Sequence, residues 1–207
     1  MVWLDNLPAG RHPLFSEPLA SWLWSGFATL LRTLQLPVDA RHLAILPILS
    51  GVLAISIARG IAHEIVPGRN GRVTTLALLG TLGVSQLYFG HIESYPLISV
   101  FILAYLYLGL RRARGRDSPA LLAISLAAAI SSHLIALYLA PSYLLTVVTD
   151  RRPPWQRVAL VLMPLLLAAS ALALLGFRVE DFLRPFWTIQ AGVGGGSAPH
   201  FQALRWS

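Results

Sequence analysis

Long apolar stretches separated by short polar breaks dominate the pattern of this chain. Several stretches approach the roughly 20 residues that a helix needs to cross a bilayer. The stretch 119–148 is too long for one crossing, since such a helix would reach about 45 Å, and Ser131, Ser132 and His133 interrupt it near its middle. The pattern therefore predicts an all-α, polytopic transmembrane bundle over 43–177. Its spans are expected at about 43–61, 73–90, 96–110, 119–131, 133–148 and 158–177.

The segments on either side of this bundle are more polar. Residues 1–42 are predicted to form an external loop and then an amphipathic helix at the membrane interface, with Trp22, Trp24 and Leu30 on its apolar side. Asp39 is placed to cap the helix that follows. Residues 178–207 are predicted to form an external polar, glycine-rich tail. Both ends of the sequence resemble cut ends, so we expect a fragment of a longer protein.

Composition agrees with a membrane protein and excludes other classes. Hydrophobic residues make up 56% of the chain and charged residues only 12%, whereas a soluble domain carries about 25% charged residues. The sequence contains no cysteine, which excludes disulfides and thiolate metal sites. Every basic residue is an arginine, and the arginines lie in short breaks between apolar runs instead of along one polar face. This distribution argues against a nucleic-acid partner and leaves membrane lipid as the expected surroundings.

The arginines also predict the orientation of the chain. They concentrate in the breaks at 59–72, 111–118 and 149–157, and arginine-rich loops remain on the cytoplasmic side. The opposite ends of the spans should then be external, and so should both ends of this chain. That side collects Asp39, His42, the segment 91–95 and the break at His133, so that of the six histidines only His63 is expected inside.

The chemistry of the chain is concentrated between two of the predicted spans. His91, Glu93, Ser94 and Tyr95 form a polar cluster that is costly to place beside lipid, and such groups usually line a cavity or an aqueous face. The cluster can also be an ordinary solvated loop that caps the next helix. His133 can serve in a hydrogen bond between helices, or join His91 and Glu93 around a divalent metal.

A family resemblance rests on these residues. The run YFGHIESYPL at 88–97 precedes a span, an arginine cluster and a small-residue helix that ends in Ser-His-Leu, and RHPLF at 11–15 precedes the interfacial helix. This order resembles the bacterial multi-span glycosyltransferases of the C-type superfamily, which are related to protein O-mannosyltransferases and the aminoarabinose transferase. The resemblance covers most of the chain. It implies transfer of a sugar from a polyprenyl-phosphate carrier to an acceptor, here unidentified, on the external face of a bacterial inner membrane.

The resemblance also implies roles for residues. An acid in the first external loop acts as general base in that family; Asp5 is the first choice here, and Asp39 and Glu93 are the other catalytic candidates. The family's first span and its paired Asp-Glu are missing from this sequence. Groups available to bind the donor phosphate and sugar are Arg11, His12, Arg41, His42, His91, Tyr95 and His133.

Two other functions fit the same pattern. A proton-coupled carrier can use intramembrane His and Glu as a relay and a broken helix as its substrate site, and a non-catalytic membrane subunit needs no site. The depth of the polar groups in the membrane distinguishes an enzyme from a carrier. Catalytic groups should lie at the external rim, and transport groups should lie near the centre of the membrane.

Overall fold

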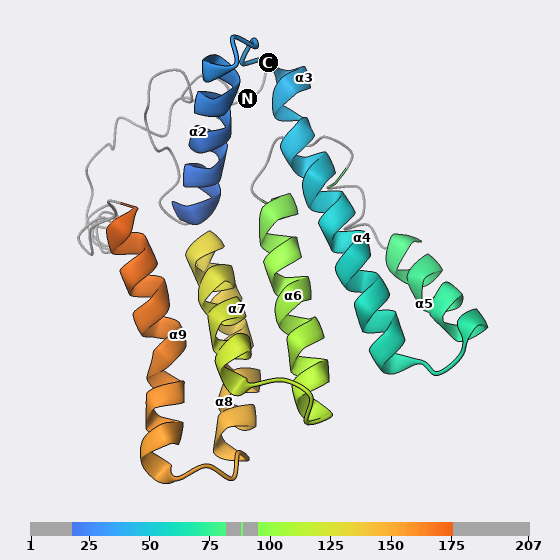
Figure 1. Cartoon of the computed structure of the whole chain (residues 1–207), viewed down its shortest axis with the longest axis vertical. Coiled ribbons are helices and arrows are strands. Elements are labelled where there is room, and N and C mark those ends of the chain that lie inside the picture. Colours follow the sequence, from blue (N-terminus) through green and yellow to red (C-terminus); the bar gives the residue numbers. More distant parts are fainter. Residues whose placement is uncertain (1–17, 82–87, 89–94, 176–207) are drawn as a thin grey trace, which may run out of the picture.

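The computed structural model describes residues 18–81, 88 and 95–175. These residues form helices joined by short loops, with no strand among them (Figure 1). The elements are α2 (Pro18–Thr33), α3 (Ala40–Leu43), α4 (Ile45–Ile65), α5 (Arg69–Thr81), α6 (Tyr95–Ala113), α7 (Pro119–Ser132), the 3-10 helix η3 (Leu134–Leu139), α8 (Ala140–Val148) and α9 (Pro154–Leu174). Among them, α6, α9 and the combined stretch Ala40–Ile65 are long and apolar enough to cross a membrane.

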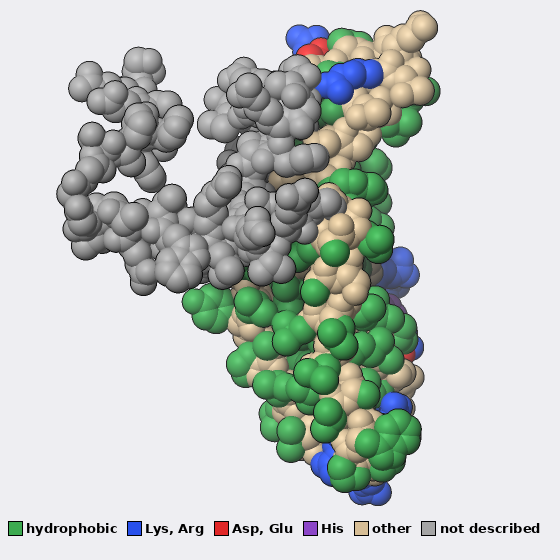
Figure 2. Space-filling view, turned by 90° about the vertical axis from the view of Figure 1, so that its left-hand side faces the viewer, with side chains coloured by type: hydrophobic (Ala, Val, Ile, Leu, Met, Phe, Trp, Pro, Cys, Tyr) green, Lys and Arg blue, Asp and Glu red, His purple; other side chains and the backbone are tan. Residues whose placement is uncertain are grey.

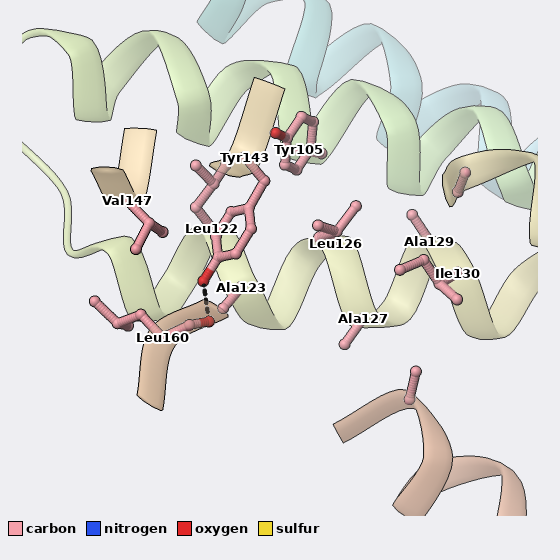
Figure 3. Packing of buried hydrophobic residues seen from close by; sticks show 12 residues of the cluster. Tyr105, Leu122, Ala123, Leu126, Ala127, Ala129, Ile130, Tyr143, Val147 and Leu160 are labelled. Atoms are coloured by element: carbon pink, nitrogen blue, oxygen red, sulfur yellow. Dashed lines mark hydrogen bonds between the residues drawn. The ribbon is translucent and has the colours of Figure 1, made fainter. Parts of the chain in front are cut away.

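Helix α7 lies at the centre of the packing. It contacts α6 on one side and α9 on the other, and α4 packs on the far side of α6. Small residues of α7 let these neighbours approach closely. The core cluster combines Ala123, Ala127 and Ala129 with larger side chains that include Tyr105, Leu122, Leu126, Tyr143, Val147 and Leu160 (Figure 3).

The long apolar stretch 119–148 is divided at His133, where the sequence predicts a break. Ser118 caps the start of α7 by accepting a hydrogen bond from the Ala120 N–H, and Pro119 occupies the first turn. At the other end, the His133 N–H donates to the Ala129 carbonyl while its backbone turns extended (φ −165°, ψ 134°). The chain then returns through η3 and α8, neither of which has the 18 residues of a candidate span.

Proline shapes α9 and ties it to α8. Pro164 lies inside α9 and has no N–H to donate to the carbonyl of Leu160, four residues earlier. The hydroxyl of Tyr143 on α8 donates to that carbonyl at 2.7 Å (Figure 3). Tyr143 is 1% exposed, so water does not compete for this bond. A hydrogen bond between helices thus replaces the one that the proline removes.

Three arginines of the predicted loop at 59–72, namely Arg59, Arg69 and Arg72, lie on helices instead. Arg59 lies on α4, which continues to Ile65, and Arg72 lies on α5; the turn is only 66–68, where Gly68 has a φ of 105°. Long arginine side chains allow this, because the stem can pack along apolar surface while the guanidinium reaches water. Helix α5 has 13 residues, about 20 Å, and most of the rest of the predicted span 73–90 lies outside the described residues.

Helix α2 occurs where the sequence predicts a helix, but a different face is buried. Its buried face includes Ala20, Trp24, Ala28 and Leu31, which pack against Leu43 of α3 and Leu97 of α6. Trp22 is 46% exposed and Leu30 51%. The prediction that Trp22 and Leu30 share one face with Trp24 is wrong, because residues two apart on a helix lie about 200° apart around its axis.

Candidate functional site

One end of the α6–α7 pair holds an aromatic–imidazole pair. Tyr95 is the first residue of α6, and His133 immediately follows α7. Their rings are stacked, with centroids 6.3 Å apart and planes 26° apart. Tyr95 is 49% exposed. Two residues that are 38 positions apart in the chain therefore meet at the end of the α6–α7 pair that is opposite to the arginine-rich loop.

The hydrogen bonding of His133 fixes its tautomer. Its Nδ1 accepts a hydrogen bond of 3.0 Å from the backbone N–H of Ile135, so a neutral ring carries its proton on Nε2 and can act as a donor from that atom. Ser131 lies two residues earlier and is 2% exposed, and its hydroxyl has no hydrogen-bond partner among the residues that the structure describes.

A second pair forms at the start of α3. The Asp39 carboxylate accepts hydrogen bonds from the His42 backbone N–H (2.9 Å) and from its Nδ1 (2.8 Å). The backbone hydrogen bond and then the side-chain hydrogen bond lower the pKa of Asp39 below its ordinary value of 3.8. The carboxylate both caps the helix and orients the imidazole. Arg41, between them in sequence, is exposed.

Helix α2 connects the two pairs. Leu43 follows His42 directly, Leu97 lies two residues after Tyr95, and both belong to the same buried cluster as Trp24 of α2. Helix α2 also contacts α7. Figure 1 shows α2 rising from the end of α7 toward α3. The Asp39–His42 pair therefore lies near one end of α2 and the Tyr95–His133 pair near its other end, about 24 Å of helix apart, and both lie on the side away from the arginine-rich loops.

The arginine-rich breaks lie at the other end and are held by ion pairs. Glu64, whose side chain is 9% exposed, accepts from Nη1 of both Arg114 and Arg116 at 3.0 Å. This joins the last turn of α4 to the loop between α6 and α7. Since a buried carboxylate needs compensation by charge and hydrogen bonds, the two arginines explain how Glu64 can lie on an apolar helix.

Further ion pairs extend this network to α8. Arg111 donates from Nη2 to Asp117 at 3.0 Å, and its Nε lies 2.7 Å from the other carboxylate oxygen in the same ion pair. Arg112 pairs with Asp150, which follows α8 and also lies 3.7 Å from Arg152. The three arginine-rich segments therefore meet at one end, as the orientation rule requires.

Sequence reasoning treated these arginines only as topology signals and missed their partners Glu64, Asp117 and Asp150. A signal was present for Glu64: it is the only acid within the stretch 40–65, and an ionisable residue in an apolar span always calls for a partner. The partner itself, some 50 positions away, could not be identified without the packing of α4 on α6.

Other predicted site residues lie outside the described ranges, namely Asp5, Arg11, His12, His91 and Glu93. The suggested metal site of His91, Glu93 and His133 therefore has one described member. Within 18–81, 88 and 95–175, no three His, Asp or Glu side chains come together as metal ligands.

Comparison of the chain with family models, curated proteins and solved structures finds no match.

Proposed function

We propose that this chain is part of a membrane glycosyltransferase of a bacterial inner membrane, which transfers a sugar from a polyprenyl phosphate to an acceptor on the external face. The observation that carries the proposal is that the Asp39–His42 and Tyr95–His133 pairs both lie on the side of the molecule away from the arginine network. If arginines mark the cytoplasmic side, both pairs face outward. The resemblance of 88–97 to the C-type superfamily supplies the reaction class.

The chemistry needs a base and a group that stabilises the leaving phosphate. The acceptor hydroxyl oxygen bonds to the anomeric carbon while the bond between that carbon and the phosphate oxygen breaks, and the hydroxyl proton passes to a base. The lowered pKa of Asp39 makes its carboxylate a weaker base than an ordinary aspartate. The better candidate is the His42 ring, because Asp39 holds its Nδ1 and can stabilise the imidazolium that forms.

The departing polyprenyl phosphate carries negative charge that the protein must compensate. Arg41, which precedes His42 in the chain, is the described group suited to this, since a guanidinium donates to phosphate oxygens. Tyr95, stacked on His133, offers an aromatic face and a hydroxyl to the sugar. Asp5, Arg11, His12, His91 and Glu93 complete the proposed site.

Depth favours an enzyme over the carrier alternative. A carrier places its broken helix and substrate site near the middle of the membrane. His133 instead stacks on the first residue of α6, a helix of 19 residues or about 28 Å whose last turn carries Arg111 and Arg112. This position supports a site toward one face.

The test is sugar transfer with membranes that contain the chain. A panel of radiolabelled polyprenyl-phosphate sugars is supplied, and released polyprenyl phosphate is measured for the unaltered chain, His42→Gln, His133→Gln and the control His63→Gln. His63 is an exposed histidine near the arginine network. We expect release to fall at least 100-fold for His42→Gln, about 10-fold for His133→Gln and to be unchanged for His63→Gln.

Release that is insensitive to His42→Gln and His133→Gln would contradict the assigned site. If a folded, membrane-inserted chain releases polyprenyl phosphate from none of the donors, the proposed reaction is contradicted. Uptake of a solute into sealed vesicles by that same preparation would favour the carrier hypothesis over the enzyme hypothesis.

A further inference from the structure

The corner between α8 and α9 carries an excess of positive charge. Asp150 is the single acid in the loop 149–153, and Arg112 reaches it from α6. Arg151 and Arg157 make no ion pair among the described residues, and Arg152 lies 3.7 Å from Asp150. Arg112 and Arg152 lie against the one carboxylate, and Arg157 donates to the Val148 carbonyl at 3.3 Å. The four arginines and the one acid of this corner leave an excess of three positive charges. In Figure 2, arginine side chains mark the lower end of a largely hydrophobic surface.

Two apolar grooves run along α9 from this corner. The larger has a volume of about 650 Å³ and begins at Arg152; its lining includes Trp155, Ala159, Met163, Leu166 and Ser170. The smaller, about 310 Å³, lies between α8 and α9 and extends along α9 from Pro154 to Leu162; its lining also includes Val147, Val148 and Arg157. At about 100° per residue, the two sets of α9 residues fall on opposite sides of the helix.

The length of the larger groove suits an acyl chain. From Trp155 to Ser170 the larger groove extends along 15 residues of helix, or about 22 Å, and one leaflet of a bilayer provides roughly 15 Å of hydrocarbon depth. Trp155, 68% exposed, lies at the arginine end of the groove, the position that tryptophan prefers at a membrane interface. A chain in either groove would therefore have its polar end beside an arginine.

We propose that the α8–α9 corner is a binding site for a diacyl phospholipid with an anionic headgroup, supplied by the leaflet on the arginine-rich side. Arg151, Arg152 and Arg157 bind the phosphate and headgroup, because guanidinium groups pair with phosphate oxygens in bidentate geometry. One acyl chain lies in each groove beside α9. Two grooves that begin at one basic corner fit two chains on one headgroup, whereas a polyprenyl phosphate has a single chain.

This site is at the end opposite to His42 and His133 and does not depend on the sugar-transfer proposal. The experiment measures lipid retention by the purified full chain in detergent, by native mass spectrometry. Phosphatidylglycerol and phosphatidylcholine with identical acyl chains are added at equal concentration, and a polyprenyl monophosphate is added separately. The variants are Arg151→Gln/Arg157→Gln, the charge-matched control Arg59→Gln/Arg69→Gln, and Ala159→Trp, which fills the larger groove without changing charge. Arg59, Arg69 and Ala159 are exposed.

We expect one phosphatidylglycerol per chain, retained in preference to phosphatidylcholine. Juxtamembrane arginines contribute about fivefold each to anionic-lipid binding, so the Arg151→Gln/Arg157→Gln variant should bind roughly 25-fold more weakly. The Arg59→Gln/Arg69→Gln control should retain the lipid, and Ala159→Trp should lose it while remaining folded by circular dichroism. Equal retention of both phospholipids, equal loss in the charge-matched control, or stronger retention of the polyprenyl monophosphate would overturn the proposal.

Discussion

The hydrogen bond between Tyr143 and the Leu160 carbonyl allows a quantitative prediction. Pro164 leaves that carbonyl without its helical donor, and the Tyr143 hydroxyl replaces the donor at 2.7 Å from a buried position. Tyr143→Phe removes the donor and keeps the ring, so the packing against α7 and α9 is preserved. Among the described residues, the Tyr143 hydroxyl is the side-chain donor to this carbonyl.

The magnitude follows from the cost of an unpaired polar group. Leaving a buried acceptor without a partner costs about 1–3 kcal/mol in proteins generally, and hydrogen bonds between membrane helices average about 0.6 kcal/mol with a maximum near 1.7. We expect Tyr143→Phe to lower the free energy of unfolding by about 1.5 kcal/mol, toward the upper limit because Tyr143 is 1% exposed. In a Pro164→Ala background the backbone N–H returns, and the same change should cost about 0.5 kcal/mol.

The assay is a double-mutant cycle on the purified chain, unfolded by SDS in mixed micelles and followed by circular dichroism. Tyr138→Phe is the matched control, since Tyr138 is 83% exposed and its hydroxyl should contribute nothing measurable. A coupling of about 1 kcal/mol between Tyr143→Phe and Pro164→Ala is expected. Additive effects of the two changes, or an equal cost for Tyr138→Phe, would refute the reasoning.

Three further predictions concern charge and packing. Glu64→Gln should lower the unfolding free energy by about 1–2 kcal/mol, less than a fully buried pair because both arginines reach solvent; SDS titration measures it, and an unchanged midpoint would contradict the ion-pair assignment. Because the folded pKa of Asp39 is lowered, its stabilising contribution is present above about pH 3.8 and lost as the pH falls through the folded pKa. The unfolding temperature of Asp39→Asn should therefore fall less between neutral and acid pH than that of the unaltered chain. An equal fall in both proteins would argue against this contribution. Gly51→Ala places a Cβ 2.8 Å from that of Tyr88 and should cost about 1–3 kcal/mol, measured by the same titration; full stability would mean that this contact is not present.

Much of the helical architecture could be predicted from local rules. Ser118 with Pro119 is a standard helix start, and His133 within a run that is too long for one span marks a break. The gathering of three arginine-rich breaks at one end followed from charge alone. These features depend on residues that are close in sequence, or on a constraint that the membrane imposes on every loop.

What could not be predicted depends on pairs that are distant in sequence. The partner of Glu64 is on another helix, and nothing near Leu160 in sequence indicates that Tyr143 compensates for Pro164. The stacking of Tyr95 on His133 likewise required α6 and α7 to be antiparallel and in register. On α2, the two tryptophans suggested a single apolar face. Helical periodicity instead places Trp22 and Trp24 on different faces, and the face with Trp24 is the one that packs against α3 and α6.

The central claim is that the Asp39–His42 and Tyr95–His133 end faces outward while the arginine network faces the cytoplasm. The chain has no cysteine, so a thiol reagent labels this protein only at a cysteine that is introduced. Ala40→Cys, Asn70→Cys and Ala113→Cys change exposed residues at the two ends and can be probed in intact cells with a membrane-impermeant maleimide. We predict that Ala40→Cys is labelled in intact cells and the other two only after permeabilisation. Labelling of Asn70→Cys and Ala113→Cys in intact cells, with Ala40→Cys protected, would contradict the orientation and remove the external site.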